Sequence, residues 1–364
     1  MKQNQDIEKL IKANLFNMKA YNSIEPFDVI SERIGIPVEG IIKLDGNENP
    51  YGCSPRVQHA LSTYPYYHIY PDPEQRQLRK SLEEYTGISA ECIVVGMGSD
   101  ELIDLILRLF IVPGDKVINC VPTFGMYPFS TEICDGKVVN IPRDKLFDID
   151  VAGVKKNING HTKVLFIASP NNPTGNTILQ RDVMEIAETG IVTVIDEAYF
   201  EFCGETVVPL VAQYDNLIVL RTFSKWAGIA GLRVGYGVFS PKITKHIMKI
   251  KQPYNLNIAA QIAAIETLKD LEYKQKTIKA IREERERLFN KLGEIKSLKP
   301  LSSKANFILC RVLNSEASRI HHELQQRGIF IRYFDTPLLE NYLRISVGKP
   351  EHTDALIESL KEVC

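Results

Sequence analysis

Between Leu82 and about Phe239, short apolar segments alternate with segments of helical periodicity or with loops. Short apolar segments bounded by turn residues are typical of buried strands. Strands that alternate with helices form a largely parallel sheet, and the helices cover both of its faces. The pattern therefore predicts an α/β fold, a three-layer αβα sandwich with a mostly parallel sheet. The expected strands are Cys92–Val95, Lys116–Val121, Val138–Ile141, Val164–Ala168, Val192–Ile195, Leu217–Leu220 and Val234–Phe239, and the expected helices are Asp100–Phe110, Thr123–Ile133 and Arg181–Glu188.

The pattern changes after Lys251, where helices and strands suit a smaller α+β domain. A chain of 364 residues is longer than one hydrophobic core usually supports, so we expect two domains. The smaller domain would combine residues 29–44 with 252–364, and its charged helix near 272–292 would bridge to the other domain. Residues 45–251 would form the large domain. Residues 1–28 would form an N-terminal arm that needs a partner surface to become ordered.

Composition excludes several classes of protein. The chain has 44 basic and 45 acidic residues, so neither nucleic acid nor an anionic membrane surface is an expected partner. No apolar run approaches the roughly 20 residues that span a bilayer. The seven cysteines are scattered without a C-x-x-C pair, and the histidines lack partners at metal-ligand spacing. We therefore expect no metal site and no disulfide framework, and a cytoplasmic protein or a mature organellar one.

Five polar or aromatic clusters each begin at or directly after the carboxyl end of a predicted strand. They are Gly96–Glu101, Pro122–Tyr127, Ser169–Gly175, Asp196–Tyr199 and Arg221–Lys225. In an open parallel sheet these strand ends line one crevice, in which ligands bind. We therefore expect segments that are far apart in the sequence to converge on one site.

The first three clusters suit a flat, phosphorylated ligand. Gly96–Glu101 opens a helix, whose free N–H groups favour an anion, although a helix N-cap made by Ser99 or Asp100 explains the same residues. Phe124 could stack on a flat ring, although a core position is the commoner fate of a phenylalanine. Asn172 lies in a turn and could offer its amide to a ring oxygen.

The last two clusters place charged side chains at strand ends. Asp196 follows four apolar residues, where a carboxylate is costly to bury unless it is paired, and a protonated pyridine nitrogen is a suitable partner. A lone lysine is usually a surface charge, but Lys225 follows a buried type of strand. A desolvated amine near other cations has a lowered pKa and condenses with an aldehyde. Ser224 and Arg233 add a hydroxyl group and a planar cation for a phosphate. Together the clusters supply every group that one cofactor, pyridoxal 5'-phosphate, needs.

At this point the sequence resembles the fold-type I pyridoxal-phosphate aminotransferases over nearly its whole length, and within them the histidinol-phosphate aminotransferases. The N-E-N-P-Y-G and Y-P-D-P motifs indicate this subfamily. The motifs that carry the resemblance are L-D-G-N-E-N-P-Y-G (44–52), Y-P-D-P (70–73), G-S-D-E (98–101), S-P-N-N-P-T-G (169–175), D-E-A-Y (196–199), S-K (224–225), A-G-L-R (230–233) and L-R-I-S-V-G (343–348).

The resemblance implies a role for each residue around the cofactor. Lys225 would form the Schiff base and later move the proton, and Asp196 would pair with the pyridine nitrogen. Asn172 and Tyr199 would hydrogen-bond the ring 3-oxygen. Phe124 would stack on the ring where the family often has tyrosine, so a role for that hydroxyl group is lost. The residues implied to hold the phosphate are Ser99, Asp100, Ser224 and Arg233.

The resemblance also implies the substrate and assembly contacts. Arg344 would take the substrate carboxylate or phosphate as a bidentate fork. Arg332 and Tyr21 would help to bind the substrate phosphate, and Asn49 would also contact the substrate. Tyr70 would reach the cofactor phosphate of a neighbouring subunit, which implies a homodimer with shared active sites.

The activity that the resemblance implies is a ping-pong transfer of an amino group. L-Glutamate would give its amine to the cofactor and leave as 2-oxoglutarate, and imidazole-acetol phosphate would accept the amine to become L-histidinol phosphate. Three alternatives stay open. They are a threonine-phosphate decarboxylase, an aromatic aminotransferase and, from a different class, a non-catalytic regulator that binds pyridoxal phosphate.

Overall fold

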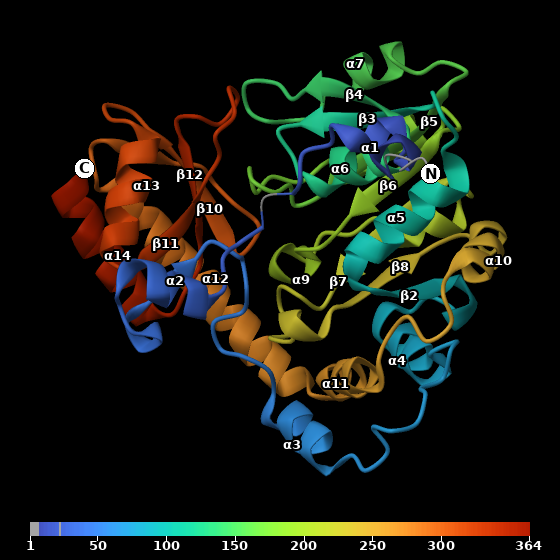
Figure 1. Cartoon of the computed structure of the whole chain (residues 1–364), viewed down its shortest axis with the longest axis horizontal. Coiled ribbons are helices and arrows are strands. Elements are labelled where there is room, and N and C mark those ends of the chain that lie inside the picture. The colour runs from blue at the N-terminus through green and yellow to red at the C-terminus, as the bar shows by residue number, and fades with distance from the viewer. Residues whose placement is uncertain (1–6, 22) are drawn as a thin grey trace, which may run out of the picture.

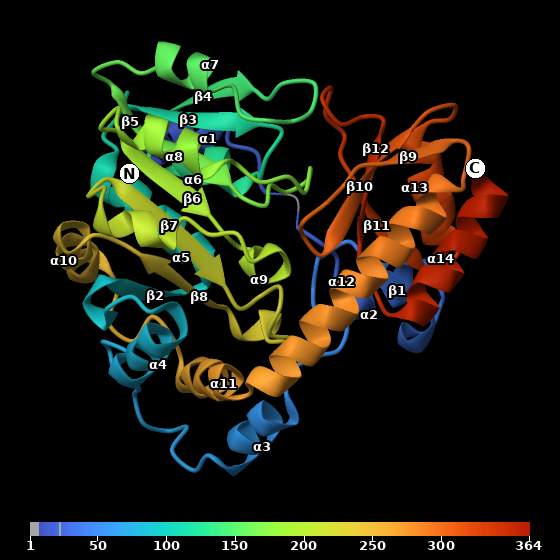
Figure 2. The same ribbon diagram turned by 180° about the vertical axis from the view of Figure 1, so that it is seen from behind.

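The computed structural model describes residues 7–21 and 23–364. Figures 1 and 2 show a large domain and a smaller one, joined by the long helix α12 (Leu271–Gly293). Seven strands form the sheet of the large domain and five form the sheet of the smaller domain. The predicted α/β fold is confirmed.

The large sheet has the order β2-β8-β7-β6-β5-β3-β4. Only β8 runs antiparallel to its neighbours, so the sheet is mostly parallel, as predicted. The strands are β2 (Ile93–Met97), β3 (Lys116–Val121), β4 (Lys137–Pro142), β5 (Thr162–Ala168), β6 (Val192–Asp196), β7 (Leu217–Thr222) and β8 (Val234–Val238).

Helices cover both faces of this sheet (Figures 1 and 2). Successive residues of a strand point to opposite faces, so each buried strand contributes to two cores. Val94 belongs to the core beneath α5 (Gly98–Phe110), and Val95 belongs to the core that includes α8 (Gln180–Ala187). The other helices of this domain are α3 (Pro55–Thr63), α4 (Arg76–Thr86), α6 (Met126–Ile133), α7 (Val151–Lys156), α9 (Phe200–Cys203) and α10 (Pro241–Ile250). The helix α11 (Ile258–Lys269) packs on α3 and α4 and so also belongs to the large domain, although the boundary was predicted near residue 252.

The smaller domain has a five-stranded sheet of order β1-β11-β12-β10-β9. Its first strand, β1 (Ile42–Leu44), comes from the N-terminal part of the chain and pairs in parallel with β11 (Ile329–Tyr333). The remaining elements are β9 (Leu298–Pro300), β10 (Phe307–Val312), β12 (Tyr342–Ser346), α2 (Phe27–Ile34), α13 (Ala317–Gln326) and α14 (Pro350–Val363).

The described part of the N-terminal arm packs on the chain's own large domain. It contains a 3-10 turn (Ile7–Leu10) and the short helix α1 (Ala13–Phe16), and Asn14 Nδ2 donates to the carbonyl of Glu132 on α6 at 2.7 Å. The rings of Tyr21 and Phe129 meet edge to face with centroids 5.8 Å apart. In residues 7–21 and 23–364, none of the helices has the length and apolar character to cross a membrane.

Candidate active site at the carboxyl ends of the strands

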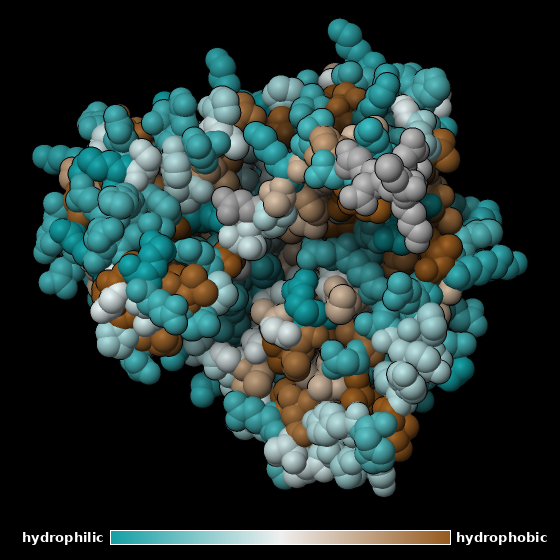
Figure 3. Space-filling view, in the orientation of Figure 1, coloured by the Kyte–Doolittle hydropathy of each residue, from teal (hydrophilic) through white to brown (hydrophobic). Residues whose placement is uncertain are grey.

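A cavity of about 490 Å³ lies where the carboxyl ends of the large sheet face the smaller domain. The surface is hollowed between the two domains (Figure 3). The structure brings together predicted site residues from all five strand-end clusters, from the arm and from the smaller domain. Those that line the cavity are Tyr21, Ser99, Asp100, Phe124, Asn172, Asp196, Tyr199, Ser224, Lys225, Arg233, Arg332 and Arg344.

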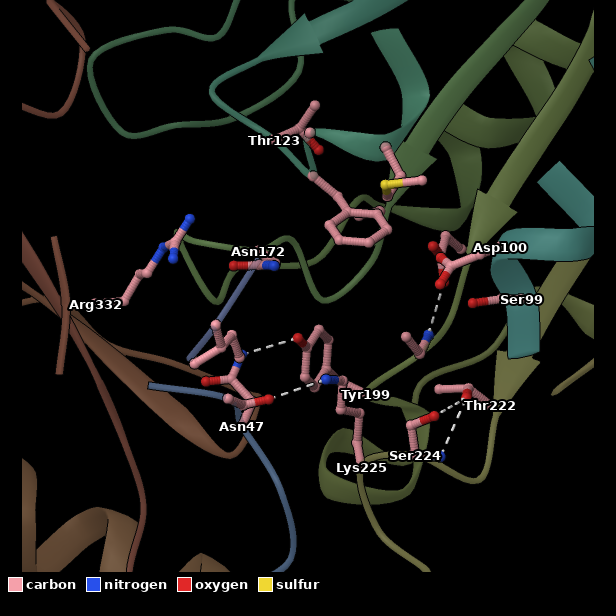
Figure 4. Close-up of a pocket in the computed structure, with 18 of the residues that line it drawn as sticks. Asn47, Ser99, Asp100, Thr123, Asn172, Tyr199, Thr222, Ser224, Lys225 and Arg332 are labelled. Carbon is pink, nitrogen blue, oxygen red and sulfur yellow. Dashed lines mark hydrogen bonds between the residues drawn. The ribbon is translucent and has the colours of Figure 1, made fainter. Parts of the chain in front are cut away.

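Lys225 lies in the loop that follows β7, and its side chain extends into the cavity (Figure 4). Its Nζ atom donates a hydrogen bond to the carbonyl oxygen of Gly46 at 3.1 Å. Burial, followed by the nearby Arg344 guanidinium, lowers the pKa of Lys225 to about 8. A larger share of the amine is therefore unprotonated near neutral pH, which is the form that attacks an aldehyde.

Asp196 ends β6 and is only 4% exposed. Its carboxylate accepts hydrogen bonds from the Tyr127 hydroxyl group at 2.8 Å and from the backbone N–H of Ala198 at 3.0 Å. No ion pair joins it to any residue in the described part of the chain, and burial raises its pKa to about 6. A buried carboxylate without a cation is costly, so the site fits a ligand that brings a positive charge, such as a protonated pyridine nitrogen.

Three side chains are positioned for a flat ring. Phe124 follows β3 and packs edge to face on Tyr127, with ring centroids 5.5 Å apart. Tyr199 accepts a hydrogen bond from Asn47 Nδ2 at 2.9 Å, so its own hydroxyl proton stays available. The Oδ1 atom of Asn172 accepts from Arg344 at 2.6 Å, and its amide nitrogen is left on the cavity side (Figure 4). The site therefore offers a ring face and two donors for a ring oxygen.

The groups that were predicted to hold a phosphate lie together at the start of α5. Gly98 has a φ of +75°, and a Cβ atom there would lie 2.6 Å from the Arg233 guanidinium, so glycine is required at this close approach. Arg233 donates to Ser224 Oγ at 3.2 Å and to the Asp100 carboxylate at 3.0 Å. A helix N-terminus, a hydroxyl group and a guanidinium thus surround one position, as a phosphate requires.

Arg332 and Arg344 are direct cross-strand partners on β11 and β12, and both line the cavity. Like charges opposite each other destabilise a sheet, and an anion between them would remove that cost. Arg344 donates to Asn172 Oδ1 and to the carbonyl oxygen of Asp45, but its buried Nε has no hydrogen-bond partner among residues 7–21 and 23–364. Burial lowers the pKa of Arg344 to about 10. The pair suits a substrate with carboxylate or phosphate groups.

Two of the predicted site residues lie elsewhere. Asn49 is buried outside the cavity, where its amide donates to the carbonyl of Trp226 at 2.6 Å and its Oδ1 accepts from the backbone of Tyr51. Its bonds hold the loop after β1 in place. Tyr70 is 78% exposed and stacks on Tyr254, with ring centroids 4.7 Å apart. Within this single chain, neither side chain reaches the cavity.

Among the lining residues that were not predicted from the sequence, three hydrogen-bond predicted site residues and so help to position them. Asn47 holds the hydroxyl group of Tyr199, Tyr127 holds Asp196, and Thr222 Oγ1 donates to Ser224 Oγ at 3.0 Å. All three lie within quoted motifs or strand-end clusters, so the sequence indicated the segments. It did not indicate which side chains of those segments point inward.

Comparison with known proteins identifies relatives over almost the entire chain. Residues 39–360 match the model of the family "Aminotransferase class I and II". The chain is 50% identical to the histidinol-phosphate aminotransferase of Dehalococcoides mccartyi, covering 98% of this chain and 99% of that protein. It is 44% identical to the chloroplastic histidinol-phosphate aminotransferase 1 of Arabidopsis thaliana, covering 98% and 86%. The crystal structure of the Sinorhizobium meliloti histidinol-phosphate aminotransferase with pyridoxal-5'-phosphate superposes with a TM-score of 0.86 at 26% identity, covering 94% of this chain and 95% of that one.

Proposed function

The chain belongs to the family of class I and II aminotransferases, and from this premise we propose that it is a histidinol-phosphate aminotransferase. It transfers an amino group between L-glutamate or 2-oxoglutarate and L-histidinol phosphate or imidazole-acetol phosphate. The observation that carries the proposal is the convergence of Lys225, the buried carboxylate of Asp196 and the arginine pair on one cavity. The first two serve amino-group chemistry, and the arginine pair serves an anionic substrate.

The cofactor is pyridoxal 5'-phosphate, and the site's donor set fits each of its parts. Lys225 would meet its aldehyde, Asp196 its ring nitrogen and Phe124 its ring face, while Asn172 and Tyr199 would meet its ring oxygen. When bound, the cofactor supplies an electron sink for the carbon that carries the amine. The residues that would hold its phosphate are Ser99, Asp100, Thr222, Ser224 and Arg233.

The protein's own groups perform the proton transfer and the orientation of the substrate. The Lys225 amine removes a proton from the amine-bearing carbon of the donor and later returns a proton to the keto carbon of the acceptor. Arg344 binds the anionic group of the substrate, and the reacting carbon of the substrate is thereby held near Lys225. Phe124 and Tyr199 line the cavity in which this carbon would be held.

An assay of the purified holoenzyme tests the proposal directly. With L-histidinol phosphate and 2-oxoglutarate, we expect L-glutamate to form at a rate well above that with aromatic amino acids. Release of CO2 from threonine phosphate without amino transfer would instead identify a decarboxylase. Equal rates with aromatic amino acids would identify an aromatic aminotransferase, and the absence of any turnover would leave a regulator that only binds the cofactor.

Replacing Arg344 by lysine is expected to raise KM for both L-glutamate and L-histidinol phosphate by about 30-fold, or about 2 kcal/mol. A lysine keeps the charge but loses the planar fork that a carboxylate or phosphate binds with two hydrogen bonds. Steady-state kinetics with each substrate would measure the effect. The matched control is Arg332→Lys, for which we expect a loss with the phosphorylated substrate alone. If Arg344→Lys impaired only one substrate, the two anions would have to use separate pockets.

The exposed aromatic side chains around Tyr70 support a homodimer with shared active sites. Tyr66, Tyr67, Ile69, Tyr70 and Tyr254 are large apolar residues that are each at least 44% exposed, and all but Tyr254 lie in the loop between α3 and α4. Burying such a patch against a second copy of the chain would be favourable. In that arrangement the Tyr70 hydroxyl group would donate to the cofactor phosphate of the partner subunit.

Mixed dimers provide a test of this shared site. Lys225→Ala and Tyr70→Ala homodimers should each be impaired at limiting cofactor, the second by about 1.5–3 kcal/mol in cofactor affinity. A mixed dimer of the two variants has one site with both native groups, so activity should recover on mixing. Tyr66→Ala, which changes another exposed tyrosine of the same loop, is the control and should keep native cofactor affinity as a homodimer. Failure of mixing to restore activity would argue that each chain completes its own site.

The cysteines support a reducing compartment, and we place the protein in the cytoplasm on that basis. All seven are free, and none is paired in a disulfide. Burial raises the pKa of Cys120 to about 11 and that of Cys310 to about 12, so both stay as unreactive thiols.

A further inference from the structure

A second cavity, of about 500 Å³, lies between the two domains and shares no lining residue with the cavity that contains Lys225. Its large-domain wall consists of residues 145–147 and 174–177. The loop after β4 reaches toward the smaller domain at this place (Figures 1 and 2). The small-domain wall consists of Lys299, Leu301, Ser302, Lys304, Arg311 and Tyr342.

Four basic residues and no acidic residue line this second cavity. They are Lys145 from the large domain and Lys299, Lys304 and Arg311 from the smaller one. Lys304 forms an ion pair with Glu205, which lies outside the lining. In the described part of the chain, the side chains of the other three make no hydrogen bond or ion pair. Cations from both domains therefore face a cavity without a counter-charge in its walls.

The strand register places two of these cations directly against each other. Arg311 on β10 is the cross-strand partner of Lys299 on β9 and of Tyr342 on β12, so the three side chains form a row on one face of the small sheet. Like charges in direct cross-strand positions destabilise a sheet. An anion bound between Lys299 and Arg311 would reverse this effect, because each would then form a charge-assisted hydrogen bond.

Hydroxyl groups and aromatic rings complete the walls. Thr174, Thr177 and Ser302 line the cavity with hydroxyl groups. The rings of Phe147 and Tyr342 meet edge to face across the domain boundary, with centroids 6.0 Å apart. Asp148, an acidic residue beside this wall, accepts a hydrogen bond from the side-chain amide of Asn176 at 3.0 Å. The hydroxyl groups of Thr174 and Thr177 already donate to Asn176 Oδ1 and to the Glu205 carboxylate, so the unpaired cations are the main donors that remain for a negatively charged ligand.

The second cavity is linked to the active site by the loop of residues 171–177. Asn172 at one end of this loop lines the active site, and Thr174 and Thr177 line the second cavity. Between them, Gly175 has a φ of +79°, and a Cβ atom there would lie 2.3 Å from Ser303 Oγ, so the loop backbone packs directly on the smaller domain. A ligand in the second cavity would therefore contact the same loop that positions Asn172 in the active site.

We propose that the second cavity binds a small polyanion of the phosphate class, held by cations of both domains. The juxtaposition of Lys145 with the Lys299–Arg311 pair across the domain boundary carries this proposal. The site goes beyond the proposed transamination, because no substrate or cofactor of that reaction is needed to fill it.

Equilibrium dialysis of the holoenzyme with labelled inorganic pyrophosphate tests the site independently of turnover. The double variant Lys299→Gln/Arg311→Gln is expected to bind one pyrophosphate per chain fewer than the native protein, or to bind it about 100-fold more weakly. Its turnover without pyrophosphate should be unchanged, because neither residue lines the active site. Pyrophosphate at the substrate site contributes equally to both proteins and cancels from the comparison.

Two further variants complete the test. Lys245→Gln/Lys249→Gln removes two exposed charges from α10 and should leave binding at the native level. If this control lost as much pyrophosphate binding as Lys299→Gln/Arg311→Gln, the binding would depend only on the overall charge of the protein, and that result would overturn the proposal. Lys145→Gln should weaken binding by about tenfold if both domains hold the ligand. Native binding by Lys145→Gln or by Lys299→Gln/Arg311→Gln would equally overturn it.

Discussion

Replacing Lys225 by alanine is expected to lower turnover by about four orders of magnitude and to abolish the absorption band of the covalently bound cofactor. Alanine can neither condense with the aldehyde nor move the proton at the amine-bearing carbon. This expectation depends on where Lys225 lies as well as on its being a lysine. Lys225 projects into the active-site cavity, and its pKa is lowered to about 8, so it is both reachable and reactive.

A second buried lysine provides the control for this experiment. Lys251 is 6% exposed and donates to Pro73 O and to Asn255 Oδ1, outside the active-site cavity. Lys251→Met should therefore keep the absorption band, even if its free energy of unfolding falls. Circular dichroism would establish that both variants are folded. Retention of the band and of turnover by folded Lys225→Ala would remove the basis for the assigned chemistry.

The convergence of the five clusters on one cavity could be predicted from the sequence because of a property of parallel sheets. Five clusters were expected at strand ends, and the cavity contains residues from each of them. Apolar runs specify the strands, and the sheet then brings the ends together. The antiparallel direction of β8 was not predicted, since a buried strand has the same apolar pattern in either direction.

Side-chain direction within irregular segments could not be predicted. Asn47 and Asn49 belong to one motif, and both orientations depend on local backbone geometry. Asn47 has a φ of +56° and turns its amide toward Tyr199, whereas Asn49 turns toward Trp226. Only strands and helices have a side-chain period that a sequence reveals. Loops have none, so the choice between the two asparagines required the structure.

The pairing of charged side chains inside the large domain also could not be predicted from the sequence. Glu197 and Arg221 lie in two of the strand-end clusters, beside Asp196 and near Lys225. They form a buried salt bridge of 2.8 Å instead of lining the cavity, and the Arg221 guanidinium stacks on the Phe200 ring at 3.6 Å. Adjacent residues at a strand end point in opposite directions, so only one of each pair can face the ligand.

Some missed helices did have a signal in the sequence. α3 and α10 both begin with serine followed by proline, at Ser54-Pro55 and Ser240-Pro241. Each serine side chain accepts a hydrogen bond from the first turn, and each proline occupies a position that needs no N–H donor. These start signals mark a helix even where the apolar pattern is short.

Replacing Asp196 by asparagine is expected to have opposite effects on stability and on catalysis. In the cofactor-free protein, burial raises the pKa of Asp196 from 3.8 to about 6. The folded state then holds more protons than the unfolded state between those pH values, so the free energy of unfolding falls as pH rises through that range. About two pH units correspond to about 3 kcal/mol, which the native protein should lose between pH 4 and 7 and the variant should not.

Denaturant unfolding of both cofactor-free proteins at several pH values would measure this difference. The substitution is not neutral for the holoenzyme, because an amide cannot keep the pyridine nitrogen protonated, and we expect Asp196→Asn to lower kcat by about 10²–10³-fold. Asp100→Asn removes a more exposed carboxylate of the same cavity but keeps Asp196, so most of the loss of stability between pH 4 and 7 should remain, because burial is the largest cause of the raised pKa of Asp196. Asp45 and Glu201 are also shifted upward by burial, but they are present in all three proteins and cancel from the difference. If the difference in free energy of unfolding between the native protein and Asp196→Asn did not change between pH 4 and 7, the Asp196 carboxylate would not be destabilising. If Asp196→Asn kept full activity, the carboxylate would not serve the ring nitrogen. Both results together would mean that the buried Asp196 carboxylate is not there to pair with a positive charge of the cofactor.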